Sequence, residues 1–340
     1  EQTEDVQKLG GVEAFDEPYM QMSIGGMLRK RAGWLSVLMV SEMFTTQALQ
    51  YFDVELQKVP VLTLFIPLVM SSGGNSGSQA STLMVRSLAL GDKGTVFVGN
   101  RNLSEVYAIV DRGGKREVKK LLTKLNSPNG VAFSKGTLFV AERNRITRFD
   151  GIEDRLDNPP EAKVVIDNLD PTNQAGHFWK YLAMGPDGKL YFNIGSPGNI
   201  VMPSYMQASV NRVDPKTGVM EQVARGVRNS VGFDFDPKTK QLWFTNHARD
   251  WVSDDLPNDT LHHLTRKNMN FGYPFCHQGD LLDPEFGKGR SCAEFDKPAL
   301  KLGPHIAPLG LRFYTGSMFP DEYKGNIFVA MHGSWNRSTK

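Results

Sequence analysis

Side chains that transfer protons or bind anions are concentrated in five segments of this 340-residue chain. Each segment contains a histidine, an arginine or both. An imidazole accepts a proton near neutral pH, and a guanidinium group binds a carboxylate through two parallel hydrogen bonds. If the fold brings these segments together, they form a single basic pocket for an anionic ligand. The segments are residues 174–181, 226–229, 246–251, 305–308 and 332–337.

A recurring strand pattern indicates how the fold would bring these five segments together. A turn residue precedes a β-branched and aromatic run in GTVFVG, GTLFVA, GKLYFN, KQLWFT and GNIFVA, which begin at residues 94, 136, 188, 240 and 325. A period of about 40 to 50 residues with several short strands is typical of propeller blades. We therefore expect an all-β propeller, with an irregular β-sandwich as the alternative. The loops that interrupt the repeat would meet at the propeller axis and carry the function.

The composition excludes several classes of protein. The chain is 40% apolar and 22% charged, with a net charge of +2 and a mean hydropathy of -0.34. These averages exclude a collagen, a disordered tail and a disulfide-dense miniprotein. Because nucleic-acid binders usually carry a clear basic excess, we expect no nucleic-acid partner.

The first 90 residues differ from the rest and predict two membrane-spanning helices. The candidate spans are Gly33–Phe52, which has the ~20 residues that cross a bilayer, and the longer Val59–Arg86, which contains the apolar run 59–70. Glu42 interrupts the first span and would face a bundle interior or a pore. The basic residues 29–31 before the first span place the N-terminus in the cytoplasm. A soluble helical hairpin is the alternative.

Two stretches in this part resemble MgtE-type magnesium transporters. They are EDVQKLGGVE at residues 4–13 and FIPLVMSSGGNSGSQASTL at residues 65–83. The small residues permit close helix packing, while Asn75 and Gln79 would offer amides to a pore. The resemblance implies magnesium as a transported ion. It covers about a quarter of the chain and omits the family's acidic pore residue, so we expect no transport by this chain alone.

The rest of the chain, from about residue 86, resembles the glucose/sorbosone dehydrogenases and is most similar to the sorbosone dehydrogenase branch. The motifs are SPNGVAF, HFWKYLAMGPDGKLYFNIG, GVRNSVGFDFDP, HARDW, NFGYPFCHQGD and HGSWNRS. The resemblance implies a six-bladed propeller, here without its last blade. It also implies pyrroloquinoline quinone as cofactor, a small sugar or sugar aldehyde as substrate, and a quinone or cytochrome as electron acceptor.

The resemblance assigns catalytic roles to two residues. His177 matches the base that takes the hydroxyl proton while hydride passes to the quinone, and Arg228 matches the arginine beside the quinone carbonyls. Asn229 would add amide hydrogen bonds. From the residues alone, His177 has an alternative role as a turn cap.

Four further residues are candidates for cofactor contact. Lys180, Arg249 and Arg337 would bind the cofactor's carboxylates, and Trp179 would stack on a flat ring. The alternatives are ordinary surface charge for the cations and core packing for the indole.

A calcium ion is also implied by the resemblance. The carbonyl groups of Ala248 and Arg249 are its candidate ligands, with Asp254 or Asp255 nearby. This stretch departs from the family pattern: a glycine expected near Ala248 is missing, and His262 stands where an asparagine is usual. His305 and His332 would line the substrate entrance or make structural hydrogen bonds.

The two cysteines, Cys276 and Cys292, match family positions. A disulfide between them would imply an oxidising compartment, and two buried thiols are the alternative.

The two resemblances predict a two-part chain, with a membrane segment at residues 1–90 and a truncated propeller at residues 91–340. RSLALGD at residues 86–92 fits both families, so we expect a fusion of two incomplete proteins, natural or artefactual. The resemblance places the propeller in the periplasm, whereas a two-span topology places it in the cytoplasm. The alternative function is a magnesium-transporter fragment fused to a non-catalytic propeller.

Overall fold

The fold of the second part of the chain is given by a computed structural model that describes residues 88–169, 176–334 and 336–337. The chain divides into two units, at residues 1–76 and 77–340, and all described residues belong to the second. Both predicted membrane spans, with Glu42, Asn75 and Gln79, lie outside the described residues. Within the described part, no helix is long and apolar enough to cross a bilayer.

The first two sheets each contain four antiparallel strands in chain order. The first sheet consists of β1 (Leu88–Leu90), β2 (Val96–Asn100), β3 (Glu105–Arg112) and β4 (Lys115–Leu122). The second consists of β5 (Gly130–Ser134), β6 (Thr137–Ala141), β7 (Ile146–Asp150) and β8 (Lys163–Ile166).

The third and fourth sheets follow the same antiparallel plan. The third consists of β9 (Leu182–Met184), β10 (Leu190–Ile194), β11 (Ser209–Val213) and β12 (Met220–Arg225), and β16 (Met269–Asn270) joins β12 in parallel. The fourth consists of β13 (Phe233–Phe235), β14 (Leu242–Asn246), β15 (Asn258–His263) and β19 (Leu300–Pro304).

The segment between β15 and β19, residues 264–299, is an insertion into the fourth sheet. It contains β16, the hairpin of β17 (Cys276–His277) and β18 (Leu281–Leu282), and the 3-10 turn Cys292–Glu294. A disulfide joins Cys276 to Cys292. Because β16 pairs with the third sheet, the insertion links two neighbouring sheets.

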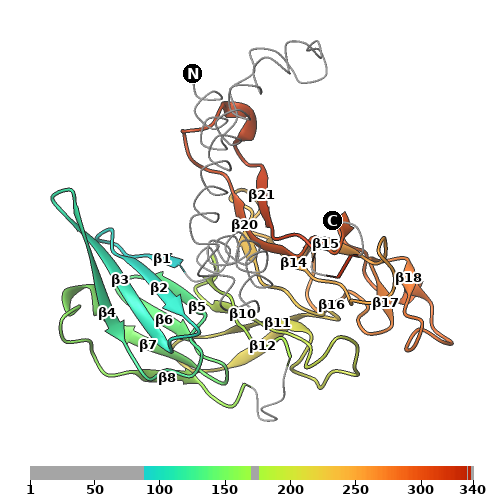
Figure 1. Cartoon of the computed structure of the whole chain (residues 1–340), viewed down its shortest axis with the longest axis horizontal. Helices are drawn as coiled ribbons and strands as arrows, with labels where there is room; N and C mark the ends of the chain where they lie inside the picture. The colour runs from blue at the N-terminus through green and yellow to red at the C-terminus, as the bar shows by residue number, and fades with distance from the viewer. Residues whose placement is uncertain (1–87, 170–175, 335, 338–340) are drawn as a thin grey trace, which may run out of the picture. The chain divides into compact units, whose positions relative to one another are not determined.

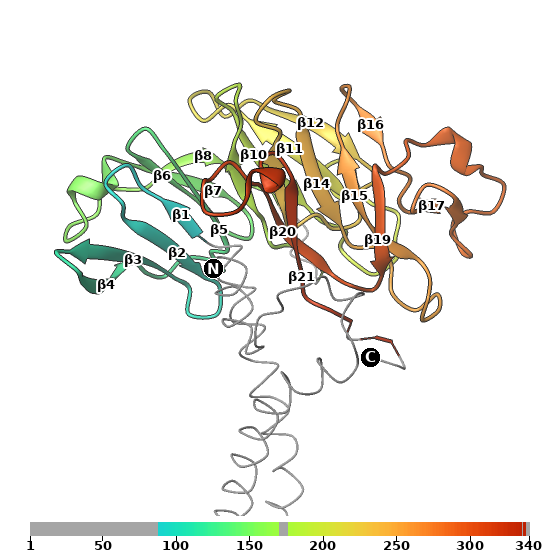
Figure 2. The same cartoon turned by 90° about the horizontal axis from the view of Figure 1, so that it is seen from above.

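The sheets are arranged as propeller blades. The first strands of successive sheets are neighbours, since β1 contacts β5 and β5 contacts β9. Figures 1 and 2 show the four large sheets following one another in chain order, with the β17–β18 hairpin at the end farthest from β1–β4. The all-β propeller prediction is therefore confirmed for the described residues.

Apolar side chains pack between consecutive sheets. Phe97 of β2 and Leu138 of β6 lie in one cluster, and Phe192 of β10 lies in the next. Phe244 of β14 belongs to the third cluster. These buried residues come from the repeated strand pattern, which forms the second strand of each large sheet. Burying these strands on both faces requires an almost continuous apolar sequence.

The predicted number of blades is wrong. The family resemblance implied a six-bladed propeller without its last blade, but the described residues form four sheets of four or five strands. The fifth copy of the strand pattern is β21 (Ile327–Met331), which pairs only with β20 (Pro308–Phe313) in a two-stranded sheet. One copy of the pattern marks one strand, and it does not guarantee the other strands of a blade.

Candidate active site

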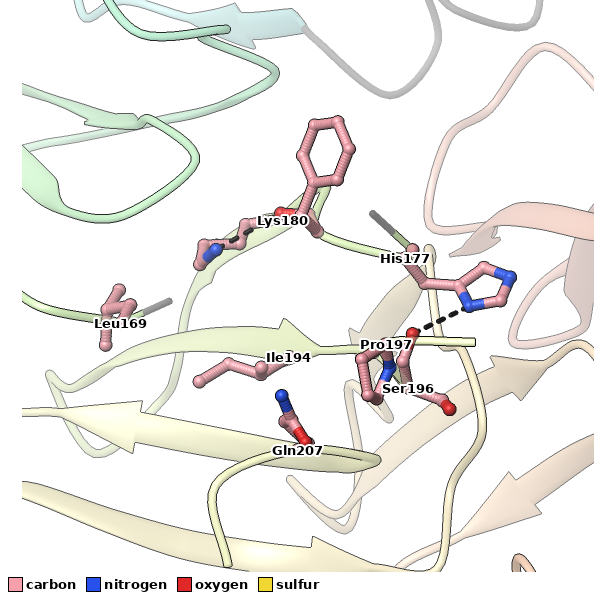
Figure 3. Close-up of a pocket in the computed structure, with 10 residues that line it drawn as sticks. Leu169, His177, Lys180, Ile194, Ser196, Pro197 and Gln207 are labelled. Atoms are coloured by element: carbon pink, nitrogen blue, oxygen red, sulfur yellow. Dashed lines mark hydrogen bonds between the residues drawn. The ribbon is translucent and has the colours of Figure 1, made fainter. Parts of the chain in front are cut away.

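His177 lies in the loop before β9, and its ring is held by a backbone carbonyl. Nδ1 lies 2.9 Å from the oxygen of Ser196, and the His177 backbone N–H donates to the same oxygen at 3.0 Å. Figure 3 shows the His177 ring with its hydrogen bond to the Ser196 oxygen drawn as a dashed line. A carbonyl only accepts hydrogen bonds, so Nδ1 carries the proton and Nε2 presents a lone pair. Burial, and then the charge of Arg228, lower the pKa of His177 to about 4, so the ring is neutral at pH 7.

Two glycines make this close contact possible. A Cβ at Gly195 would lie 2.5 Å from both the Cβ and the carbonyl oxygen of His177. A Cβ at Gly176 would lie 2.4 Å from the oxygen of Pro197, and Gly176 has a φ of +146°. The loop therefore approaches the chain after β10 at a distance that only glycine tolerates.

Arg228 lies in the turn between β12 and β13, and its guanidinium group is buried. Nε donates to the Asn199 oxygen at 2.8 Å, and Nη1 donates to the Ala248 carbonyl at 2.7 Å. Nη2 donates to the Asn199 side-chain oxygen and to the Asp250 carboxylate, both at 2.9 Å. Four of the five guanidinium N–H groups thus have protein partners, which fixes the plane of the group.

His177 and Arg228 line the same cavity. Its other lining residues come from the loop after β14, from β15, from the loop after β19 and from the end of the described chain. They are His247, Ala248, Asp250, Asp259, His305, Ala307 and Asn336. All five sequence segments that carry histidine or arginine therefore contribute to this cavity, and the expected convergence is present in the described residues.

His177 also lines a second hollow (Figure 3). Lys180 lines this hollow and is buried, and its Nζ donates to the carbonyls of Arg143 and Phe178. The neighbouring Trp179 packs under the Arg101 guanidinium, which lies 3.8 Å from the ring centroid. Neither Lys180 nor Trp179 lines the cavity shared by His177 and Arg228.

Asn229 is buried beside that cavity. Its backbone N–H donates to the Asn246 side chain at 3.2 Å, and its amide nitrogen lies 3.4 Å from Nδ1 of His247. His247 in turn lies 2.9 Å, through Nε2, from the Pro308 carbonyl. Asn229 therefore supports the wall formed by His247.

Two carboxylates of the cavity were not predicted from the sequence. Asp259 accepts hydrogen bonds from the backbone N–H groups of Ala248 and Ala307, each at 2.8 Å. Burial raises the pKa of Asp259 to about 6, although these two bonds oppose the shift. Asp250 accepts from Arg228 and from Asn336. Asp250 lies within the HARDW motif, whereas Asp259 is one residue inside a strand, where the sequence offers no signal of a cavity.

The structure gives Arg249 and Arg337 partners of their own. Arg249 is buried and forms ion pairs with Asp283 at 2.6 Å and Glu285 at 2.7 Å, both in the insertion. Arg337 pairs with Asp255 at 3.1 Å, and its buried Nε has no hydrogen-bond partner in the described part of the chain. Neither arginine lines the cavity of His177 and Arg228.

Two of the candidate calcium ligands have arginine partners in the structure. The Ala248 carbonyl accepts from Arg228, and Asp255 is exposed and paired with Arg337. Asp254 lies in the same exposed turn region. Among the described residues, no group of three His, Cys, Asp or Glu side chains is arranged to hold a metal. His305 lines the cavity and bonds to the Ser253 carbonyl at 2.7 Å, whereas the half-buried His332 does not line it.

Comparison with known proteins places this fold and site in a family. Residues 70–340 match the TrAA12-like family. The chain belongs to the TrAA12-like family. Because the match covers most of the chain, it includes every described residue of the cavity.

Solved structures share the fold of this family member. A Trichoderma reesei protein of Carbohydrate-Active Enzymes Family AA12 superposes with a TM-score of 0.64 at 20% identity, over 75% of this chain and 74% of that one. The PQQ domain of pyranose dehydrogenase from Coprinopsis cinerea, in its holo form, gives a TM-score of 0.61 at 19% identity, over 74% of this chain and 72% of that one.

Three curated relatives match different shares of the chain. An uncharacterized protein of Borreliella burgdorferi is 29% identical over 75% of this chain and 68% of its own length. The Coprinopsis cinerea pyrroloquinoline quinone-dependent pyranose dehydrogenase is 28% identical over 43% of this chain. The Thermus thermophilus magnesium transporter MgtE is 37% identical over 27% of this chain. The matched regions span only 26% of that dehydrogenase and 20% of that transporter.

Proposed function

We propose that this TrAA12-like protein is a quinoprotein oxidoreductase that oxidises a small sugar or sugar aldehyde. In this proposal, hydride passes to pyrroloquinoline quinone and His177 acts as the base. The observation that carries the proposal is that His177 and Arg228 line one cavity, with the unprotonated Nε2 of a neutral imidazole available. The match to a pyrroloquinoline quinone-dependent pyranose dehydrogenase of Coprinopsis cinerea supports it.

The residues of the cavity fit a planar, anionic cofactor. Arg228 keeps one N–H outside its four protein bonds, and His305 and Asn336 add further polar groups. The buried, unpaired Nε of Arg337 is one residue from Asn336 and offers a donor to a carboxylate. Arg228 would therefore hold the cofactor, and Asn229 would support the cavity wall formed by His247. Arg337, Lys180 and Trp179 do not line this cavity, so their contact with the cofactor stays a prediction.

The chemistry of the proposed reaction balances around His177. When bound, the quinone supplies the two-electron acceptor for hydride from the substrate's C–H group. Nε2 of His177 accepts the proton of the hydroxyl group on the same carbon, and a carbonyl forms there. The low pKa keeps the ring unprotonated at neutral pH, and the Ser196 carbonyl stabilises the imidazolium through Nδ1–H. Arg228 would stabilise negative charge that develops on the acceptor.

Calcium stays a prediction from resemblance. The Ala248 carbonyl already accepts from Arg228, and Asp255 pairs with Arg337 in the exposed turn. Because these candidate ligands are engaged with arginines, no step of the proposed reaction is assigned to a metal.

The test is reconstitution of the purified chain with pyrroloquinoline quinone, with and without calcium. Dye reduction is then followed with several aldoses and with sorbosone. We expect turnover on at least one of these substrates, and His177→Ala should abolish it while leaving quinone binding intact. Full quinone occupancy without turnover would instead favour a propeller that only binds a partner.

A second candidate is a magnesium-transporter fragment, because the match to MgtE covers about a quarter of the chain. The residues that would carry it, Glu42, Asn75 and Gln79, lie outside the described residues. Magnesium flux into liposomes tests this alternative, and we expect none. The same segment is proposed to attach the protein to a membrane.

In this proposal, the disulfide indicates the compartment in which the propeller is located. A disulfide persists in oxidising environments, so the Cys276–Cys292 pair favours a periplasmic location over a cytoplasmic one. Protease accessibility of the propeller in intact and in permeabilised cells decides between the two.

A further inference from the structure

The segment Ala248–Asp250 holds Arg228 from both of its ends. The Ala248 carbonyl accepts from Nη1 of Arg228 at 2.7 Å, and the Asp250 carboxylate accepts from Nη2 at 2.9 Å. Both residues line the cavity. The position of this three-residue segment therefore sets where the guanidinium group of Arg228 lies.

The middle residue of the segment is anchored elsewhere. The Arg249 guanidinium is absent from the cavity lining and is buried against the insertion, where Nη1 meets Asp283 and Nη2 meets Glu285. An ion pair between solvent-exposed side chains would fix the cavity wall to the insertion only weakly. Here one partner is 0% exposed, so the bond is shielded from water and from salt.

Asp283 is built to hold this arginine. One of its oxygens accepts from the backbone N–H groups of Glu285 and Phe286, each at 2.8 Å. The other accepts from Arg249 at 2.6 Å and from Nε2 of His277 at 2.7 Å. Burial opposes ionisation, but the bonds from His277 and Arg249 hold the pKa of Asp283 well below its usual value.

The insertion that presents Asp283 is itself fixed to the propeller. The Cys276–Cys292 disulfide closes it, and His277 directly follows Cys276. β16 pairs with β12, the strand that leads into the turn of Arg228. The same insertion therefore contacts both sides of the Arg228 site, through β12 and through Arg249.

We propose that Asp283 is a positioning residue that fixes Arg228 in the cavity by holding Arg249 and, through it, the segment Ala248–Asp250. A buried ion pair is often no more stabilising than apolar residues of the same volume, so stability alone does not account for the pair. Its effect on the cofactor rests on the proposed function, whereas its effect on Arg228 does not.

The first test is quinone affinity. Asp283→Asn keeps the shape of the side chain and removes the charge, and we expect it to weaken binding of pyrroloquinoline quinone to the full chain at least tenfold. The matched control is Asp280→Asn, the same substitution three residues away on a side chain that is 58% exposed, and it should stay within twofold of wild type. Near-UV circular dichroism checks that both variants keep native packing.

The second readout needs no cofactor. Because the charge of Arg228 lowers the pKa of His177, release of Arg228 should raise that pKa. NMR titration of the imidazole, assigned with a His177→Gln variant, measures it in the apo protein. If wild type binds no quinone, the proposed function fails and this titration alone decides the positioning role.

Two results would overturn the proposal. A folded Asp283→Asn variant with wild-type quinone affinity and an unchanged His177 titration removes its basis. If Asp283→Asn does not fold, Glu285→Gln replaces it, since Glu285 is 58% exposed and its loss deletes one bond to Arg249. We then expect about threefold weaker quinone binding and a raised pKa of His177, and wild-type values of both would refute the role.

Discussion

A single carbonyl group decides which nitrogen of His177 is available for chemistry. Because Nδ1–H donates to the Ser196 carbonyl oxygen, Nε2 is the only ring nitrogen with an available lone pair. The sequence motif around His177 predicted a base but not the tautomer, because Ser196 lies 19 residues away along the chain. This hydrogen bond depends on Gly195, because the absence of a side chain there lets the two loops approach closely.

The low pKa of His177 predicts a pH dependence of stability. An unfolded chain protonates this ring near pH 6.5, whereas the folded protein does so only near pH 4. The associated stability is therefore complete above pH 6.5 and is lost as the pH falls toward 4, by on the order of 3 kcal/mol. His177→Gln should remove this loss. Urea unfolding at pH 7, 5.5 and 4.5 measures it, and His332→Gln, at a half-buried histidine outside the cavity, serves as a control that should follow wild type.

Arg228 and Arg249 show why the sequence predicted some cavity residues correctly and others not. Arg228 and Arg249 both lie in recognisable motifs, and both were expected to contact the cofactor. Their side chains differ in direction: Arg228 lines the cavity, while Arg249 reaches the insertion. Neither direction is encoded in local spacing, because each depends on an acceptor that is distant in the sequence. Asp259 was missed for the same reason, since its partners Ala248 and Ala307 belong to other loops.

At the scale of elements, the repeated pattern predicted strands β2, β6, β10, β14 and β21 where the structure has them. An alternating or continuous apolar run after a turn is a local property, and these strands form wherever it occurs. The pairing of β16 with β12 was not predicted, because β16 has only two residues and joins a sheet completed 44 residues earlier. Such a contact is decided by tertiary packing.

The close approach of the two loops at His177 predicts a strong effect of one methyl group. In Gly195→Ala, the new Cβ would lie 2.5 Å from the His177 carbonyl oxygen, so a backbone must move. We expect a loss of about 1–3 kcal/mol in the free energy of unfolding, together with lower turnover. Gly198→Ala is the control, because its Cβ would meet only the side chain of Val201. Equal stability of the two variants would contradict the packing described for His177.

The disulfide should contribute measurably to the stability of the insertion. Cys276 and Cys292 are separated by 16 residues, and closing a loop of that size is worth about 3 kcal/mol in the chain-entropy model. The double variant Cys276→Ala/Cys292→Ala should unfold at lower urea concentration than wild type. Dithiothreitol should lower the wild-type midpoint to that of the variant and leave the variant unchanged. An identical midpoint for oxidised wild type and the variant would count against this contribution.

At the scale of the whole molecule, the two resemblances divide the chain between different kinds of chemistry. The residues that line the cavity all lie between His177 and Asn336, within the unit of residues 77–340. The TrAA12-like match begins at residue 70. The cavity thus lies in the part of the chain where the sequence placed the candidate site, because a propeller cavity is assembled from loops of its own blades.

This division predicts that the second unit binds the cofactor without the first. Residues 77–340, expressed alone, should bind pyrroloquinoline quinone with an affinity within about threefold of the full chain, since each described contact of the cavity is internal to that unit. Isothermal titration calorimetry of both proteins measures the difference, and His177→Gln and Arg228→Gln in each background show whether the same cavity is used. An Arg228→Gln effect that is large in the full chain but absent in residues 77–340 would mean that the first unit changes how the quinone is bound. Equal effects in both backgrounds would place the binding energy in the propeller alone.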